Sequence, residues 1–351
     1  MTERPDGDAS QLPGEPAQLP EDPAPGDQLP AVLGPGVHRR SLFSLEGRAA
    51  PALYLVGWIA TVSGLAAIAV SFLGAGSAGA RWVFLGGILV FALGLIAAAG
   101  SQAVERSRQT WLPYRGPSPV LTFLAVIAAT LLLIIVVLGP LSALGLDARS
   151  PLATTVSLLL TTLVYVGAVR LLVVGPGALS WHEMGLGQPA RAAARELAVG
   201  AVLALPVLVV TLVLAALLSR FLTPAPSALP PSSDVPALLL NLLSAAILAP
   251  IGEELFFRGF TTTAWSRVHG ARQAIVRGAI FFALAHVATL FDASFAEGAE
   301  RALFAFLALL PASIALGWVF LARRSLYASI GLHTTFNAIQ VLLVYVALSA
   351  G

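Results

Sequence analysis

The chain has 351 residues, of which 57% are hydrophobic and only 11% are charged, with a formal net charge of +2. A soluble globular domain carries roughly 25% charged residues, so this composition excludes one and indicates a chain that mostly faces lipid. There is no cysteine, which excludes disulfides, thiol catalysis and cysteine-ligated metal sites.

The first 50 residues differ from the remainder. Residues 1–36 hold seven acidic side chains, one arginine and many prolines, and such a segment cannot bury enough apolar surface to offset its chain entropy. We therefore expect a disordered, acidic, proline-rich cytoplasmic tail. A basic juxtamembrane segment with Arg39, Arg40 and Arg48 follows it up to residue 50.

Apolar runs of about 20 residues recur from Pro51 to the end of the chain, each long enough to cross a hydrocarbon core of about 30 Å. They do not alternate apolar and polar residues as the strands of a membrane β-barrel do. A spanning segment must also satisfy its own backbone hydrogen bonds, which favours helices. The sequence predicts an all-α, polytopic transmembrane helix bundle of about nine spans, near residues 52–74, 82–100, 119–139, 151–173, 197–218, 236–258, 274–291, 302–321 and 327–348.

Arginine supplies all 20 basic residues, and its distribution alternates along the chain. The segments before the first span and after the second, fourth, sixth and eighth spans carry two to four arginines each, whereas each remaining loop carries one. Cytoplasmic loops are enriched in arginine and lysine. We therefore predict a multi-pass cell-membrane protein with a cytoplasmic N-terminus and an external C-terminus.

The segment Ser180–Glu196, SWHEMGLGQPARAAARE, is short and amphipathic. We expect it to lie along the cytoplasmic interface, with Trp181 at the level of the lipid headgroups. His182 and Glu183 are interpreted as solvated loop residues rather than as metal ligands.

Glu253 and Glu254, in LAPIGEELFFRGF, are the only acidic residues inside the nine predicted spans. Ionised carboxylates are costly there and are usually paired or functional. Arg258 lies four residues after Glu254, which is the favourable order for a helical ion pair. Glu253 is rotated by about 100° from Glu254 on an α-helix, so the two carboxylates should have different tasks. Pro250 removes the hydrogen bond to the carbonyl of Ala246 and should bend the helix.

Two histidines also fall inside predicted spans: His286, four residues after Phe282, and His333, four residues before Asn337. An unpaired imidazole or amide in hydrocarbon is expensive, so each should face other helices. At a rise of about 1.5 Å per residue, Glu253, His286 and His333 lie roughly 8–14 Å from the arginines near their spans. The three can therefore meet in a cavity open to the cytoplasmic side. Any one of them alone is more often structural than catalytic.

The ordered set E-E-x-x-x-R, F-x-x-x-H and H-x-x-x-N resembles the CPBP family, the CAAX proteases and bacteriocin-processing enzymes. In this chain, Glu253 to Arg258, Phe282 to His286 and His333 to Asn337 supply the three patterns. The tract SWHEMGLG is similar to the loop that often precedes this core in the family. The resemblance implies an all-α intramembrane endopeptidase, with residues 176–351 as the catalytic core and residues 51–175 as accessory transmembrane helices.

The resemblance also implies a task for each residue. Glu253 would be the general base, and His286 would help to activate the water. His333 and Asn337 would bind the oxyanion. The supporting residues would be Glu254, Arg258 and Phe282.

No cofactor is expected, and a metal-free mechanism is favoured. A zinc ion held by Glu253, His286 and His333 is the alternative. In that case the general base would have to be Glu254, which already faces Arg258. The expected partners are the lipid bilayer and a membrane-associated or lipid-modified protein or peptide, cut near the cytoplasmic face, with no nucleic acid. The alternative function is a non-proteolytic scaffold or a bacteriocin self-immunity protein of the same fold; the intact motif set favours the enzyme.

Overall fold

The computed structural model describes residues 44–349 except 75, 227–229, 233 and 288–294. The described residues form helices and connecting segments, and none of them lies in a strand. The predicted tail, residues 1–36, and Arg39 and Arg40 lie outside the described residues. The α-helices are α1 Pro51–Leu73, α2 Ala78–Ser107, α3 Pro119–Ala143, α4 Pro151–Ala168, α5 Ala190–Leu218, α6 Val235–Leu242, α7 Ala249–Glu254, α8 Thr263–His269, α9 Ala271–Val287, α10 Phe295–Arg323 and α11 Leu326–Ser349.

Three π-helical segments interrupt or extend these helices. The first, η1 (Val169–Val174), continues α4. The second and third, η2 (Leu243–Leu248) and η3 (Leu255–Thr262), join α6, α7 and α8 into one continuous helical run. Segments of π-helix are rare and occur often at functional sites, and here two of them flank the Glu253-Glu254 pair.

Local sequence explains where several helices begin. Proline stands in the first turn of α1, α3 and α4, a position where its missing N–H costs nothing. The side chains of Ser77, Ser150 and Asp234 accept hydrogen bonds from backbone N–H groups at the starts of α2, α4 and α6. These caps satisfy donors that a helix leaves free at its N-terminus.

Eight helices or helical runs in the described part of the chain are long and apolar enough to cross a membrane. They coincide with eight of the nine predicted spans. The remaining predicted span is residues 274–291. Its residues 274–287 belong to α9, a helix of 17 residues, and its residues 288–291 lie outside the described residues. The structure thus confirms a multi-pass, all-α membrane bundle of about nine spans.

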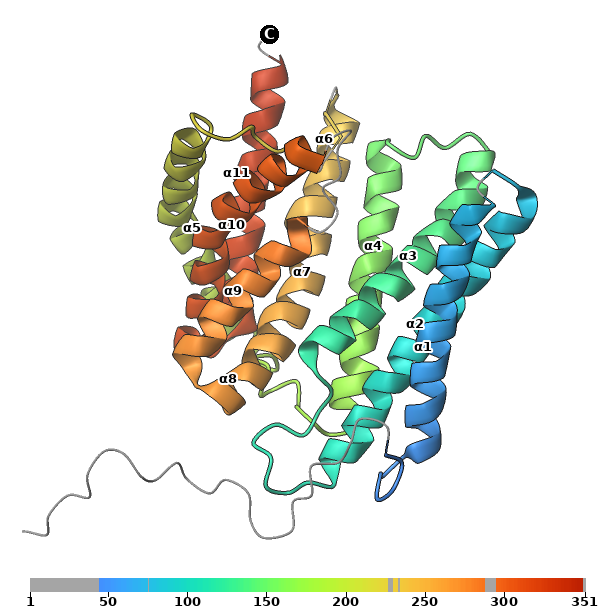
Figure 1. Ribbon diagram of the computed structural model, residues 1–351. Helices are drawn as coiled ribbons and strands as arrows, with labels where there is room; N and C mark the ends of the chain where they lie inside the picture. Colours follow the sequence, from blue (N-terminus) through green and yellow to red (C-terminus); the bar gives the residue numbers. More distant parts are fainter. Residues whose placement is uncertain (1–43, 75, 227–229, 233, 288–294, 350–351) are drawn as a thin grey trace, which may run out of the picture. The chain divides into compact units, whose positions relative to one another are not determined.

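The connections α2–α3, α4–α5 and α8–α9 lie at one end of the bundle, the lower end in Figure 1. These are connections in which the sequence places the larger numbers of arginines. The side of the membrane that this end faces stays a prediction.

The packing brings α4 against α6 and α7, and α5 against α10 and α11, while α9 packs on α10. An aromatic cluster occupies the centre of η3, where Phe256, Phe257 and Phe260 are fully buried. Phe123 of α3 and Tyr165 of α4 contact Phe256 and Phe257 with ring centroids 5.1–6.1 Å apart. This cluster fixes the helical run that carries the glutamates against α3 and α4.

The segment between α4 and α5 holds His182 and Glu183 in a loop, as the sequence predicts. Residues 181–185 form a turn, and the next helix begins at Ala190. The position of this segment along the cytoplasmic interface stays a prediction. Gly185 and Gly187 have φ values of +80° and +84°, which end helical structure and suit glycine. Glu183 is bonded to Arg267 of α8, and Met184 is completely buried. The segment is therefore fixed against α8 by the Glu183–Arg267 ion pair.

Candidate active site

The helical run α6–α8 places Glu253 and Glu254 at the end of α7, between η2 and η3. At the end of η2, the N–H of Ala249 donates to the carbonyl of Ser244, five residues back. The next donor in that pattern would be residue 250, which is a proline without an N–H. The Ala245 carbonyl therefore lacks a donor in this five-residue pattern. The predicted loss of the bond to the Ala246 carbonyl stays a prediction.

Side chains from two other helices satisfy the carbonyls of η2. Asn337 of α11 donates from Nδ2 to the Ala245 carbonyl at 2.8 Å. Thr162 of α4 donates from Oγ1 to the Leu248 carbonyl at 2.8 Å. No water is present in a hydrocarbon core to do this. Asn337 therefore supplies a donor to the Ala245 carbonyl, and Thr162 adds one to the carbonyl of Leu248, the residue directly before α7.

Glu254 and Arg258 form the predicted i, i+4 ion pair, with Oε1 2.9 Å from a guanidinium nitrogen. The two side chains are 0% and 2% exposed. The Arg258 guanidinium also donates to the Ser313 carbonyl of α10 at 3.4 Å and lies over the Phe282 ring, 4.2 Å from its centroid. A buried charge is tolerated only when it is paired and hydrogen-bonded, and Arg258 meets both conditions.

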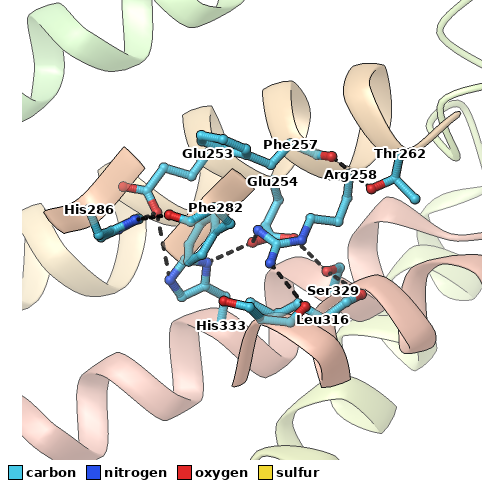
Figure 2. Close-up of polar contacts among 11 residues, drawn as sticks. Glu253, Glu254, Phe257, Arg258, Thr262, Phe282, His286, Leu316, Ser329 and His333 are labelled. Carbon is cyan, nitrogen blue, oxygen red and sulfur yellow. Dashed lines mark hydrogen bonds and ion pairs between the residues drawn. The ribbon is translucent and has the colours of Figure 1, made fainter. Parts of the chain in front are cut away.

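Glu254 also holds two residues of α11. Ser329 donates from Oγ to Glu254 Oε2 at 2.5 Å, and His333 Nδ1 lies 2.8 Å from Glu254 Oε1. Because the Glu254 carboxylate accepts, the hydrogen of this imidazole resides on Nδ1, and Nε2 points away from Glu254. Glu254 therefore orients His333 (Figure 2).

The sequence interpretation missed Ser329. Its only signal is its position four residues before His333, which places both on one face of α11. A serine in an apolar helix usually bonds its own backbone, so nothing in the sequence indicated that it reaches Glu254.

Glu253, His286 and His333 converge, as the motif depths predicted. Glu253 Oε2 lies 3.8 Å from His286 Nε2 and 3.8 Å from His333 Nε2 (Figure 2). Their side chains are 16%, 35% and 8% exposed, respectively. Unlike Glu254, Glu253 is therefore accessible to a small molecule, and its two imidazole neighbours belong to different helices, α9 and α11.

His286 is oriented by its own helix. Its Nδ1 lies 2.9 Å from the carbonyl of Phe282, which can only accept, so Nδ1 carries the hydrogen. The Phe282 ring lies 4.3 Å from the His286 ring and 5.9 Å from the His333 ring, centroid to centroid. Phe282 thus separates and positions both imidazoles while it covers Arg258.

With each imidazole hydrogen on Nδ1, both Nε2 atoms present lone pairs toward Glu253. Three acceptors around one point require a hydrogen-bond donor or a cation between them. A water molecule can bridge two acceptors 3.8 Å apart with two hydrogen bonds of about 2.8 Å. Protonation of one imidazole on both nitrogens would instead supply the donor.

These three side chains are the ones that a metal would use. Zinc ligands about 2.0–2.2 Å from the ion in a tetrahedral site lie about 3.4 Å from one another, whereas the measured separations from Glu253 are 3.8 Å. The described residues contain no group of three or more His, Cys, Asp or Glu side chains placed to hold a metal ion. The metal-free mechanism stays a prediction.

A close approach of two helix backbones sets the position of α11. A Cβ atom on Gly331 would lie 2.2 Å from the carbonyl oxygen of Leu197, and one on Gly200 would lie 2.0 Å from that of Ala328. Real Cβ contacts are never so short, so α5 and α11 touch through their main chains. Gly331 is two residues before His333, and this contact therefore fixes the depth of the imidazole.

Comparison with protein families gives one match. Residues 235–339 match the family model described as type II CAAX prenyl endopeptidase, Rce1-like. The match begins with α6 and ends in α11, and so includes Glu253, Glu254, His286 and His333. Comparisons with curated proteins and with solved structures found no match.

Proposed function

We propose, from the premise that residues 235–339 form an Rce1-like domain, that this protein hydrolyses a peptide bond of a membrane-associated substrate with Glu253 as the general base. The family match supports an intramembrane endopeptidase in general. The observation that carries the assignment is the convergence of Glu253 with His286 and His333, each 3.8 Å from its Oε2 atom.

The first step uses a water molecule between Glu253 and His286. The water oxygen attacks the carbonyl carbon of the scissile bond, and one water proton moves to Glu253 Oε2. A general base within hydrogen-bond reach contributes typically 10²–10⁴-fold. His286 Nε2 accepts the second hydrogen bond of the water and so directs its remaining lone pair toward the substrate.

The second step requires donors for the oxyanion. His333 can donate from Nε2 only when both of its nitrogens carry hydrogen, with Nδ1 still bonded to Glu254. Asn337 uses one amide hydrogen on Ala245 and would donate the other. The proton held by Glu253 then passes to the leaving amine, and the bond breaks.

Glu254, Arg258 and Ser329 do not take part in proton transfer in this scheme. They form the buried network that keeps the His333 ring in place. Preorganised donors of this kind account for much of the rate enhancement of hydrolytic enzymes. The expected substrate is membrane-associated or lipid-modified and is cut near the cytoplasmic face, toward which the arginine-rich end of the bundle would point.

The test compares peptide termini in membranes from cells that produce wild-type protein, Glu253→Gln or Asp147→Asn. Asp147 lies exposed in the α3–α4 connection, so its variant makes the same chemical change away from the site. The proposal predicts new N-termini in the wild-type and Asp147→Asn samples that are absent with Glu253→Gln. Identical termini in all three samples, at equal protein levels, would instead support the non-proteolytic scaffold.

A further inference from the structure

A cavity lies away from the candidate active site. It has a volume of about 330 Å³ and is formed by the α4–α5 connection, α8 and the C-terminal end of α10. We call it the Arg324 cavity; its lining residues are His182, Glu183, Gly185, Thr263, Ser266, Phe320, Leu321 and Arg324. Two candidate membrane spans end beside it, at His269 and at Arg323. The cavity therefore lies at the boundary between hydrocarbon and water.

The carboxylate in the Arg324 cavity is already neutralised. Glu183 Oε1 accepts from the Arg267 guanidinium, and Oε2 accepts from the N–H and the hydroxyl of Ser180 at 2.7 and 2.9 Å. Partial burial raises the pKa of Glu183, but these Ser180 and Arg267 donors outweigh it and hold the pKa below its usual range. Glu183 is thus ionised and fully engaged, and it leaves no excess negative charge.

The two adjacent arginines at the end of α10 differ. Arg323 makes a two-pronged ion pair with Glu196 of α5, with nitrogen–oxygen distances of 2.6 and 2.8 Å. In the part of the chain that the structure describes, the Arg324 guanidinium makes no hydrogen bond or ion pair, and the His182 ring makes none either. The cavity therefore holds one unneutralised guanidinium and one free imidazole beside it.

The backbone of Arg324 is strained. Its φ is +50°, and it is the one non-glycine residue with positive φ among those described. Glycine normally occupies this position after a helix, and other residues there cost of order 1 kcal/mol. Such strain tends to persist where the side chain has a task. At this position a glycine would contribute no side chain, whereas Arg324 contributes a guanidinium to the lining of the cavity.

We propose that the Arg324 cavity binds a phosphate group, carried by an anionic phospholipid or present as free phosphate. Arg324 would pair with the anion, and His182 would donate a hydrogen bond to it. Guanidinium groups suit phosphate because their geometry permits two parallel hydrogen bonds. Phe320 and Leu321 supply an apolar wall, which suits the glycerol region of a lipid at the membrane boundary. This inference does not depend on the proposed peptidase activity.

The experiment uses purified full-length protein in detergent and native mass spectrometry. The probes are dihexanoyl phosphatidylglycerol, inorganic phosphate and oleate, which is an anionic lipid without phosphate. The variants are Arg324→Gly and Arg324→Lys, with Arg272→Gln as the matched control. Arg272 is exposed in the first turn of α9, at the same end of the bundle, and does not line the cavity.

The expected result is saturable phosphatidylglycerol binding that weakens at least fivefold in Arg324→Gly and less than twofold in Arg272→Gln. Arg324→Lys, which keeps the charge but not the paired hydrogen bonds of the guanidinium, should fall between the two. Glycine relieves the positive φ, so Arg324→Gly should remain folded and lose binding alone. Equal affinity for inorganic phosphate would identify free phosphate as the source, whereas binding of the lipid alone would identify the headgroup. No saturable binding, equal binding of oleate, or equal losses in Arg324→Gly and Arg272→Gln would overturn the proposal.

Discussion

Replacing Glu254 by alanine removes the centre of the buried network. The change leaves Arg258, which is 2% exposed, without its counter-ion, and it removes the acceptor of His333 and one of the two acceptors of Ser329. Removing one partner of a buried ion pair costs about 3–5 kcal/mol. Since about 1.4 kcal/mol is a factor of ten, the unfolding equilibrium should shift by roughly two to three and a half orders of magnitude.

Glu253→Gln should behave in the opposite way. Glu253 is partly exposed, and its nearest titratable neighbours lie at 3.8 Å, so the amide should change stability by about 1 kcal/mol or less. Because the amide cannot take a proton, turnover should fall by at least about 10²-fold. The contrast between the two variants separates a structural glutamate from a catalytic one.

The assay for both is unfolding in mixed dodecylmaltoside–SDS micelles, followed by circular dichroism, together with cleavage of a substrate identified from the membrane comparison. A double variant, Glu254→Gln with Arg258→Met, removes both charges and should recover part of the lost stability. Equal stability of Glu254→Ala and Glu253→Gln would refute the reasoning, as would a double variant less stable than Glu254→Ala.

Four other outcomes are expected. Gly331→Ala should lower both stability and turnover, because its Cβ would lie 2.2 Å from the Leu197 carbonyl. Gly139→Ala on α3 should lower neither, because nothing lies within 4 Å of the new Cβ. Equal effects of the two variants would contradict the role of the contact between α5 and α11. Elemental analysis of active, purified protein should find no stoichiometric zinc, and activity lost on chelation and restored by zinc would overturn the metal-free mechanism. A reporter fused to the C-terminus should read as external; a cytoplasmic reading would mean that the spans are miscounted. Because the pKa of Glu183 is lowered in the folded state, its contribution to stability should be present above about pH 4.5 and be lost as the pH falls through the folded-state pKa. The thermal stability of the wild type should therefore fall more steeply with acid than that of Glu183→Gln. Parallel curves of melting temperature against pH would contradict this.

The parts of the site that follow helical spacing could be predicted from the sequence. The Glu254–Arg258 pair lies within one helix, so its geometry depends only on a separation of four residues. The meeting of Glu253 with His286 and His333 could be inferred from depth, because a costly polar group in lipid must face other helices. The all-α membrane bundle could be predicted because apolar runs of about 20 residues must satisfy their own backbone hydrogen bonds in lipid.

The remaining features depend on contacts between distant segments or on irregular helix. An α-helical spacing relates Pro250 to the Ala246 carbonyl alone, whereas the five-residue spacing of the π-helix η2 also leaves the Ala245 carbonyl without a backbone donor, and Asn337 supplies one. The bond of Ser329 to Glu254 joins residues 75 positions apart. A hydroxyl in an apolar helix carries no charge, so the sequence gives no reason to assign it to the site. The ion pair of Glu183 with Arg267 joins the loop before α5 to α8, and residues 84 positions apart carry no joint signal in the sequence.

The hydrogen bond from Thr162 to the Leu248 carbonyl bears on what a minimal peptidase would contain. Thr162 and Tyr165 belong to α4, and Gly200 belongs to α5, and all three lie outside the matched residues 235–339. A shortened protein limited to the matched residues would lack the Thr162 hydroxyl and the Tyr165 ring that contact this helical run, and α11 would lose its main-chain contact with Gly200. In lipid, the smallest independent unit is thus set by which helices supply donors and main-chain contacts, and it extends beyond the stretch that sequence similarity marks.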